Sequence, residues 1–86
     1  MFTLSWSNKA LDDLADIYVA ADPSERVRIA AGVDALNARL RSDPLDEGES
    51  RSGGTRVTFP ALLTVIFHVS EPRREVRVTR VRRYGR

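Results

Sequence analysis

Arginine side chains concentrate at the end of this chain, close enough in sequence to bind an anion together. The last fourteen positions hold half of all the basic residues, and every one is an arginine: Arg73, Arg74, Arg77, Arg80, Arg82, Arg83 and Arg86. A guanidinium group presents donors that match phosphate or carboxylate oxygens, so this cluster predicts an anionic partner. The alternative interpretation is a solvated strand edge, whose charges prevent pairing with another chain.

Three other side chains have the chemistry to move a proton. Histidine is the one side chain type that exchanges protons near neutral pH, and His68 is the only histidine; its other interpretation is a surface or partner-facing residue. Tyr84 follows the arginines and can stack on a base or donate a proton. Glu49 lies in a glycine-rich stretch beside Arg51, and it can serve as a base if that stretch folds toward the tail.

The charge of the chain is divided between its two parts. Residues 1–50 contain ten acidic and five basic side chains, whereas residues 51–86 contain two acidic and nine basic ones. Asp12, Asp13 and Asp16 fall on the outer face of a predicted helix, where solvation is their simplest role. A metal site is not expected, because no second set of ligands is apparent, and no cofactor is predicted.

The first twenty residues predict a strand followed by a helix. Phe2, Leu4 and Trp6 alternate with small polar residues, as in a half-buried strand, and Ser7 then offers a helix N-cap. The helix should end near residue 20, with Tyr18 in the core together with the leucines that precede it at helical spacing.

The run Asp22-Pro23-Ser24-Glu25 predicts the start of a second helix through a capping box with proline at the first helical position. The helix ends at Asp43-Pro44, and the short connection between the two helices predicts an antiparallel hairpin. Residues 42–54 predict a long surface loop. Three strands follow, at residues 55–59, 62–69 and 75–82.

The last strand contains an irregularity at Arg80. Strict alternation from Val76 and Val78 would place Arg80 on the buried face and Val81 outside, and burying an unpaired charge is too costly. A bulge near Thr79 and Arg80, or the end of the apolar surface, would resolve the conflict.

These elements predict a single α+β domain spanning residues 1–86: an N-terminal strand, an antiparallel helical hairpin and a three-stranded antiparallel meander packed on the helices. The chain is too short for two cores. It has no cysteine, no signal-peptide pattern and no apolar run of membrane-spanning length, so a cytoplasmic location is expected.

The whole pattern resembles the RelE/ParE superfamily of bacterial toxins. The matching positions cover nearly the whole chain: Trp6-Ser7, Ala10-Leu11-Asp12-Asp13-Leu14, Ile17-Tyr18, Ile29, Leu36, Leu40, Pro44, Gly53-Gly54-x-Arg56-Val57, Val65-x-Phe67-x-Val69 and Val76-x-Val78-x-x-Val81. The resemblance implies a toxin of a type II toxin–antitoxin pair, neutralised by a cognate antitoxin in a hetero-oligomer. RelE-like members are metal-independent endoribonucleases that cut mRNA on the ribosome, whereas ParE-like members poison DNA gyrase.

The ending Arg83-Tyr84-Gly85-Arg86 is similar to the tail of the YoeB-type nucleases. Arg56 lies where relatives carry basic residues that face the RNA. In a nuclease, Arg56 and Arg83 would clamp the scissile phosphate, Tyr84 would position or protonate, and His68 or Glu49 is the possible base. Arg51, Arg80, Arg82 and Arg86 are the predicted RNA-binding or partner-binding residues.

Two departures from the nuclease pattern keep other functions open. Many superfamily members have an arginine at the start of the central strand, where this chain has Thr64, and the YoeB-type tail has histidine and tyrosine where this chain has Gly85 and Arg86. A ParE-like gyrase inhibitor is therefore the leading alternative, and a non-catalytic interaction module is the third.

Overall fold

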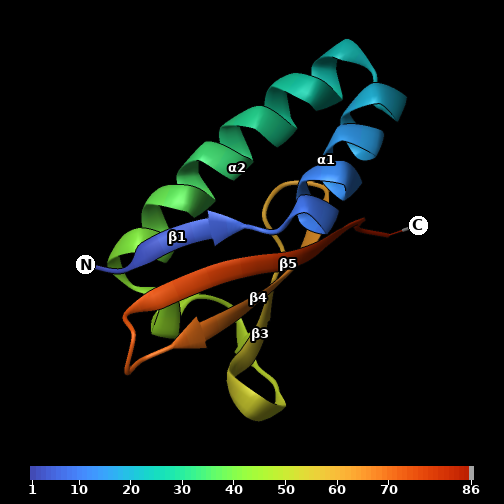
Figure 1. Ribbon diagram of the computed structural model, residues 1–86. Coiled ribbons are helices and arrows are strands. Elements are labelled where there is room, and N and C mark those ends of the chain that lie inside the picture. Colours follow the sequence, from blue (N-terminus) through green and yellow to red (C-terminus); the bar gives the residue numbers. More distant parts are fainter. Residues whose placement is uncertain (86) are drawn as a thin grey trace.

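The computed structural model describes residues 1–85, which form an α+β domain as the sequence predicted. Both helices lie on one side of the sheet (Figure 1). Two short 3₁₀ turns, at Pro44–Asp46 and Ser52–Gly54, interrupt the connection between helices and sheet. The helices and strands are β1 (Thr3–Trp6), α1 (Asn8–Ala20), α2 (Pro23–Ser42), β2 (Glu49–Ser50), β3 (Thr55–Thr58), β4 (Leu63–Ser70) and β5 (Glu75–Arg83).

In the described part of the chain the sheet has five strands in the order β1-β5-β4-β3-β2. The predicted antiparallel meander is present as β3, β4 and β5, and the sheet extends beyond it at both edges. β1 pairs with β5 in the parallel direction, with Trp6 opposite Val78.

The prediction of residues 42–54 as a loop was wrong in one respect, because Glu49–Ser50 forms β2 and pairs with β3. A two-residue strand is too short to show an alternating pattern.

The predicted helix starts are confirmed by their hydrogen bonds. The Ser7 hydroxyl accepts from the backbone N–H of Ala10 at 3.0 Å. At the second helix, Asp22 accepts from the Glu25 N–H at 2.8 Å, and Glu25 accepts from the Asp22 N–H at 3.1 Å, which completes the capping box. These caps satisfy amide groups that have no partner inside a helix, so they fix where both helices begin.

The core lies between the helices and the sheet. Phe67, Leu36 and Leu40 are fully buried there. The prediction that Tyr18 belongs to this core was wrong, because its side chain is 40% exposed and the Arg26 guanidinium lies 5.5 Å from its ring centre. Ile17 packs against the core, and since consecutive helical residues point about 100° apart, Tyr18 turns away.

The predicted bulge is confirmed in β5. Ile66 of β4 pairs with Arg80, but the next residue, Phe67, pairs with Val78, so Thr79 is the extra residue. The bulge returns Val81 to the core and turns Arg80 to the opposite face. No helix within residues 1–85 has the length and apolar composition needed to cross a membrane.

Candidate functional site

The sheet face turned away from the helices collects the candidate binding residues. Residues opposite one another on paired strands share a face, and the register places Thr64 beside Arg82, Ile66 beside Arg80 and His68 beside Arg77. We call this surface the helix-free face; its paired residues on β4 and β5 are Thr64, Ile66, His68, Ser70, Glu75, Arg77, Arg80 and Arg82. Three guanidinium groups thus lie along one strand, on one side of the sheet.

Two of these arginines are held by residues from the first thirteen positions. The Arg77 Nη1 donates to the Ser5 hydroxyl at 3.2 Å, and the Arg80 Nε donates to the Asp13 carboxylate at 2.9 Å. The same Asp13 oxygen accepts from the Val81 N–H at 3.0 Å. The hydrogen bond from Arg80 holds the pKa of Asp13 below its usual value, although burial of the carboxylate opposes this.

His68 lies on the same face, and its ring contacts the backbone of the connection before β3. Its Nε2 is 2.9 Å from the Gly53 carbonyl oxygen, and because a carbonyl only accepts, Nε2 must carry a proton. In the neutral imidazole Nδ1 is then an acceptor, as a general base requires. Glu49 in β2 lies opposite Val57 in β3, so it also belongs to this face. An Arg51 nitrogen lies 3.9 Å from the Glu49 carboxylate.

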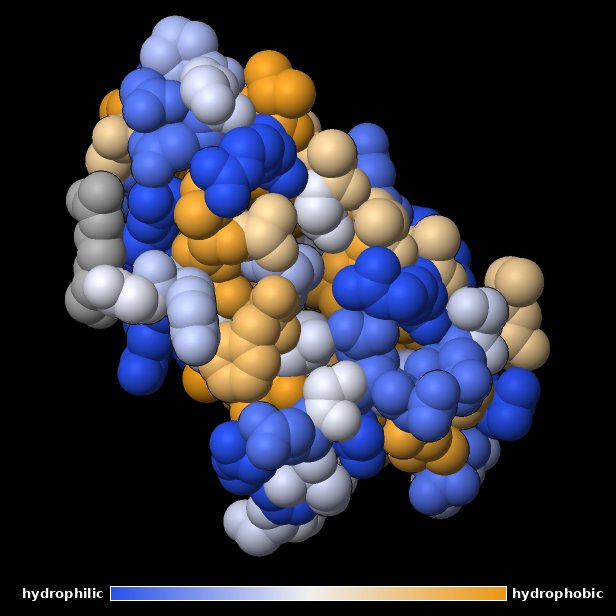
Figure 2. All heavy atoms as spheres, turned by 180° about the vertical axis from the view of Figure 1, so that it is seen from behind, coloured by the Kyte–Doolittle hydropathy of each residue, from blue (hydrophilic) through white to orange (hydrophobic). Residues whose placement is uncertain are grey.

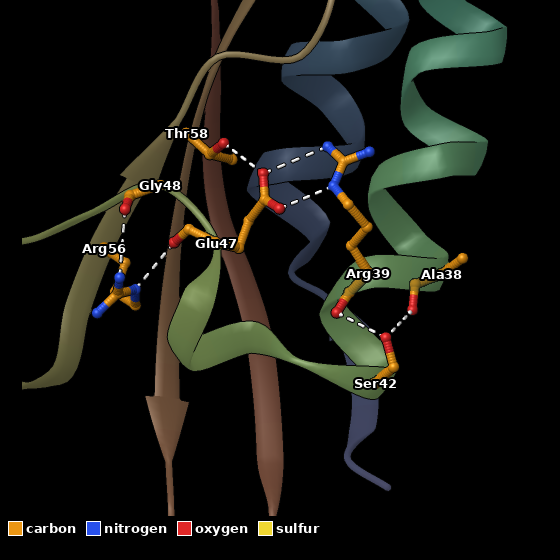
Figure 3. Close-up of polar contacts among 7 residues, drawn as sticks. All are labelled: Ala38, Arg39, Ser42, Glu47, Gly48, Arg56 and Thr58. Atoms are coloured by element: carbon orange, nitrogen blue, oxygen red, sulfur yellow. Dashed lines mark hydrogen bonds and ion pairs between the residues drawn. The ribbon is translucent and has the colours of Figure 1, made fainter.

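Arg56 belongs to the opposite face, because it pairs with the core residue Phe67. Figure 3 shows its guanidinium turned toward the connection between the helices and the sheet, where Nε donates to the Glu47 carbonyl at 3.0 Å and Nη2 to the Gly48 carbonyl at 3.3 Å. Its donors therefore hold the backbone of this connection in place.

Glu47 is the centre of that polar cluster, and sequence reasoning missed it. Its carboxylate accepts from Arg39 Nε at 2.7 Å and from the Thr58 hydroxyl at 2.6 Å (Figure 3). These two contacts, the arginine first, hold the pKa of Glu47 below its usual value, and the same ion pair raises the pKa of Arg39. The cluster ties α2, the connection after it and β3 together.

Arg83 also belongs to the helix side, because it pairs with the core residue Leu63. Its Nη2 donates to the Glu25 carboxylate at 2.6 Å, and both side chains are largely buried. Among residues 1–85, the buried Nε of Arg83 has no hydrogen-bond partner. Arg83 and Glu25 border a pocket of about 250 Å³ whose remaining lining comes from the end of the helical hairpin: Asp16, Ile17, Ala20 and Ala21.

Tyr84 packs edge-to-face against Phe59, with ring centres 5.2 Å apart. The two rings are 58% and 47% exposed, so each presents surface to a partner as well as to the other. Figure 2 shows that, seen from behind, the surface of the molecule mixes apolar patches with hydrophilic groups. Exposed aromatic rings are common anchors at binding surfaces.

The predicted site residues therefore divide between two faces. His68, Glu49, Arg80 and Arg82 share the helix-free face, whereas Arg56 and Arg83 lie on the other side and bind groups of the protein. Arg86 lies outside the described residues. Within residues 1–85 no group of three metal-ligating side chains is present.

Asp13 and Ser5 were not predicted, since neither helical periodicity nor strand alternation indicates a partner some seventy residues away. Thr64 occupies the place where an arginine was expected from the resemblance. Its cross-strand neighbour is Arg82, which is exposed, so a guanidinium group is still available beside that position.

Comparison with solved structures identifies the fold. The chain is similar to one in the chromosomal ParDE toxin–antitoxin system from P. aeruginosa (TM-score 0.72, 23% identity, 96% of each chain covered). It also resembles a chain of the RelBE2 toxin–antitoxin complex from Mycobacterium tuberculosis (TM-score 0.71, 19% identity, 99% of this chain and 93% of that one). For the isolated E. coli RelE toxin the TM-score is 0.66 at 15% identity, over 100% of this chain and 87% of that one.

No family model and no curated protein matches the sequence. The chain has the RelE/ParE toxin fold, as its residue pattern suggested.

Proposed function

We propose that this protein is the toxin of a type II toxin–antitoxin pair and that it cleaves mRNA on the ribosome without a metal ion. The fold supports the first part, since its structural neighbours come from toxin–antitoxin systems. The second part rests on one observation: the helix-free face combines a row of arginines with His68, whose Nδ1 is an acceptor.

This arrangement suits cleavage by the ribose 2′-OH. Such a reaction needs a group that accepts the hydroxyl proton and cations that stabilise charge developing on the phosphate. His68 is placed to accept the proton, with Arg77 opposite it on β5. Arg80 and Arg82 follow Arg77 in the same direction along β5, so they would bind successive phosphates on one side of the scissile one, and Arg82 would replace the arginine absent at position 64.

The sequence-based roles of Arg56 and Arg83 fit this reaction less well. Both belong to the helix side and are engaged by Glu47, Gly48 and Glu25, whereas His68 faces the other way. We assign them to holding the domain together. Tyr84, at the end of β5, remains a candidate for stacking on a base of the RNA.

Controlled expression in a bacterial host tests both parts of the proposal. Induction should stop growth, and co-expression of the neighbouring gene product, the proposed antitoxin, should restore it. Primer extension on translated mRNA should show new cuts that disappear with His68→Gln and persist with Arg83→Ala if that variant folds. Unimpaired growth in several hosts would refute the toxin assignment.

A ParE-like gyrase inhibitor is the second candidate, because the engagement of Arg56 and Arg83 and the threonine at position 64 depart from the nuclease pattern. A DNA supercoiling assay with purified gyrase separates the two. Growth arrest with inhibited supercoiling and unchanged primer-extension patterns would establish gyrase inhibition and exclude the nuclease.

A further inference from the structure

Arg80 reaches the helix-free face because of two features that act together. The first is the bulge at Thr79, which reverses the alternation of β5. Without the extra residue, Arg80 would share the core face with Val76 and Val78. With it, Arg77, Arg80 and Arg82 all lie on the helix-free face.

The second feature is the carboxylate of Asp13 on α1. β1 ends opposite Val78, so beyond that point α1 and not a strand covers the edge of β5. There the Asp13 carboxylate accepts from the Val81 N–H and from Arg80 Nε. The Asp13 side chain is 11% exposed, while that of Arg80 is 41% exposed. The carboxylate is thus fixed in the protein, and the arginine it holds extends into solvent.

This contact leaves the binding end of Arg80 unoccupied. Asp13 engages Nε, and the two terminal amino groups of Arg80 form no hydrogen bond within residues 1–85. These two groups are sufficient for a bidentate contact with a phosphate. An arginine side chain loses considerable rotamer freedom when it binds, and a side chain that is already fixed loses less.

We propose that Asp13 is a positioning residue that orients Arg80 to bind the phosphate backbone of single-stranded RNA. The inference rests on the proposed function in taking RNA as the ligand. A row of arginines along one strand, with side chains of alternate residues about 7 Å apart, suits a linear series of anions. The acidic N-terminal part of the chain thereby organises the basic C-terminal part.

The proposal makes a prediction opposite in sign to that of simple electrostatics. A negative charge beside a polyanion site repels the ligand, so neutralising it should tighten binding. If Asp13 positions Arg80, neutralising it should weaken binding instead. Asp12 is the matched control, because it is exposed on the same helix and makes no hydrogen bond or ion pair within residues 1–85.

The experiment measures binding of a fluorescein-labelled oligouridylate, about twelve nucleotides long, to the purified full chain by fluorescence anisotropy. Asp13→Asn should weaken binding by about threefold to tenfold, the cost of immobilising one long side chain. Asp12→Asn should leave binding unchanged or tighten it slightly. If Asp13→Asn also leaves binding unchanged or tightens it, or if the wild-type chain does not bind, the proposal is overturned.

Two further variants keep the test decisive if Asp13→Asn does not fold in a thermal melt. Arg80→Lys retains the charge but loses the planar group that Asp13 orients, and Arg82→Lys changes an arginine that forms no such contact with residues 1–85. Arg80→Lys should weaken binding more than Arg82→Lys. Equal losses would refute the positioning role.

A salt titration adds a readout that a purely structural role would not change. Arg80→Ala should lower the slope of log affinity against log salt concentration by about 0.7, as expected for one lost phosphate contact to a single strand. Asp13→Asn in that background should cause no further loss. An unchanged slope, or a full additional loss from Asp13→Asn, would contradict the proposal.

Failure here is distinguishable from failure of the proposed function. Growth arrest and primer extension report on toxicity and cleavage. Comparing the anisotropy of Asp13→Asn, Asp12→Asn and the Arg80 variants reports on whether Asp13 positions Arg80 for binding. Cuts in mRNA combined with equal effects of Asp12→Asn and Asp13→Asn would leave the nuclease intact and refute the positioning role. If Asp13→Asn weakened binding and Asp12→Asn did not, while primer extension showed no new cuts, the positioning of Arg80 would stand and the nuclease would be refuted.

Discussion

Asp13 and Glu47 are two largely buried carboxylates that engage arginines in similar ways, yet they serve different parts of the molecule. Their side chains are 11% and 13% exposed, and each accepts from a guanidinium group and from one further donor. The Glu47 carboxylate accepts hydrogen bonds from both Nε and Nη2 of Arg39, so this guanidinium pairs with a group of the protein in a bidentate contact. Asp13 accepts only from Nε of Arg80, so the two terminal amino groups of Arg80 make no hydrogen bond to the described part of the chain.

The comparison of these two ion pairs indicates that a buried carboxylate–arginine contact can either join elements of the fold or hold an arginine for binding. At Glu47 the further donor is Thr58, so the ion pair connects α2 to β3 across the intervening connection. At Asp13 the further donor is the Val81 N–H, next to Arg80 itself, so the contact fixes a single strand segment. We therefore expect changes around Glu47 to affect mainly stability and changes around Asp13 to affect mainly binding.

Gly48→Ala should have the largest effect, because it disturbs the segment that presents Glu47. Gly48 has φ of +66°, and an added Cβ would overlap the Val57 carbonyl oxygen and lie 2.8 Å from the Thr58 Cβ. Left-handed strain and the displaced β2–β3 contact should together cost more than about 3 kcal/mol of unfolding free energy. Urea denaturation measures this.

Gly53→Ala is the matched control for that substitution. Gly53 has the same φ of +66°, but apart from its own residue and its two chain neighbours, no atom of residues 1–85 lies within 4 Å of the added Cβ. Only the backbone cost remains, about 1 kcal/mol. Equal losses for the two variants would show that the packing around Glu47 contributes nothing beyond backbone strain.

The two carboxylates also show what the sequence can reveal about this fold and what it cannot. The bulge at Thr79 was predictable, because a charged residue interrupted an alternating strand. The capping box was predictable because its signal lies within four consecutive residues. The parallel pairing of β1 with β5 was not, since alternation identifies the buried face of a strand but not its neighbour.

The same reasoning explains why the sequence did not show on which face each candidate residue lies. Periodicity grouped Asp13 with its exposed neighbours on α1, although Asp13 lies beside the edge of β5 beyond the end of β1 and accepts the Val81 N–H there. Arg56 and Arg83 were chosen by resemblance to the nuclease branch, which does not say which face of the sheet each residue occupies in this chain. Their faces follow from strand register, which depends on where the bulge falls and which strands pair.

Glu47→Gln should have an intermediate effect that depends on pH. At neutral pH the loss of a charge-assisted contact should lower the unfolding free energy by about 2 kcal/mol. The folded-state pKa of Glu47 lies below its ordinary value of 4.5, so the carboxylate stabilises the fold fully above that value. As the pH falls through the lower folded-state value, this contribution disappears.

Urea denaturation between neutral pH and about pH 3 tests this linkage. The stability difference between wild type and Glu47→Gln should shrink toward zero in acid. Glu49→Gln is the control, because its carboxylate is 65% exposed and its nearest arginine nitrogen is 3.9 Å away. A difference that stays constant with pH would mean that the charge of Glu47 does not stabilise the fold.

Arg80→Ala should have the smallest effect on stability, less than about 1 kcal/mol, because its side chain is 41% exposed. After the substitution Asp13 keeps the Val81 N–H as a donor and Lys9 at 3.8 Å, so its carboxylate is not left unpaired.

Arg83→Ala provides the contrast, since Arg83 is 20% exposed and joins the end of β5 to the start of α2 through Glu25. Its loss should cost about 2 kcal/mol, the range for a hydrogen bond between charged groups. If thermal or urea denaturation showed Arg80→Ala to be as destabilising as Arg83→Ala, Arg80 would be a structural residue, and the distinction between the Asp13 and Glu47 contacts would fail.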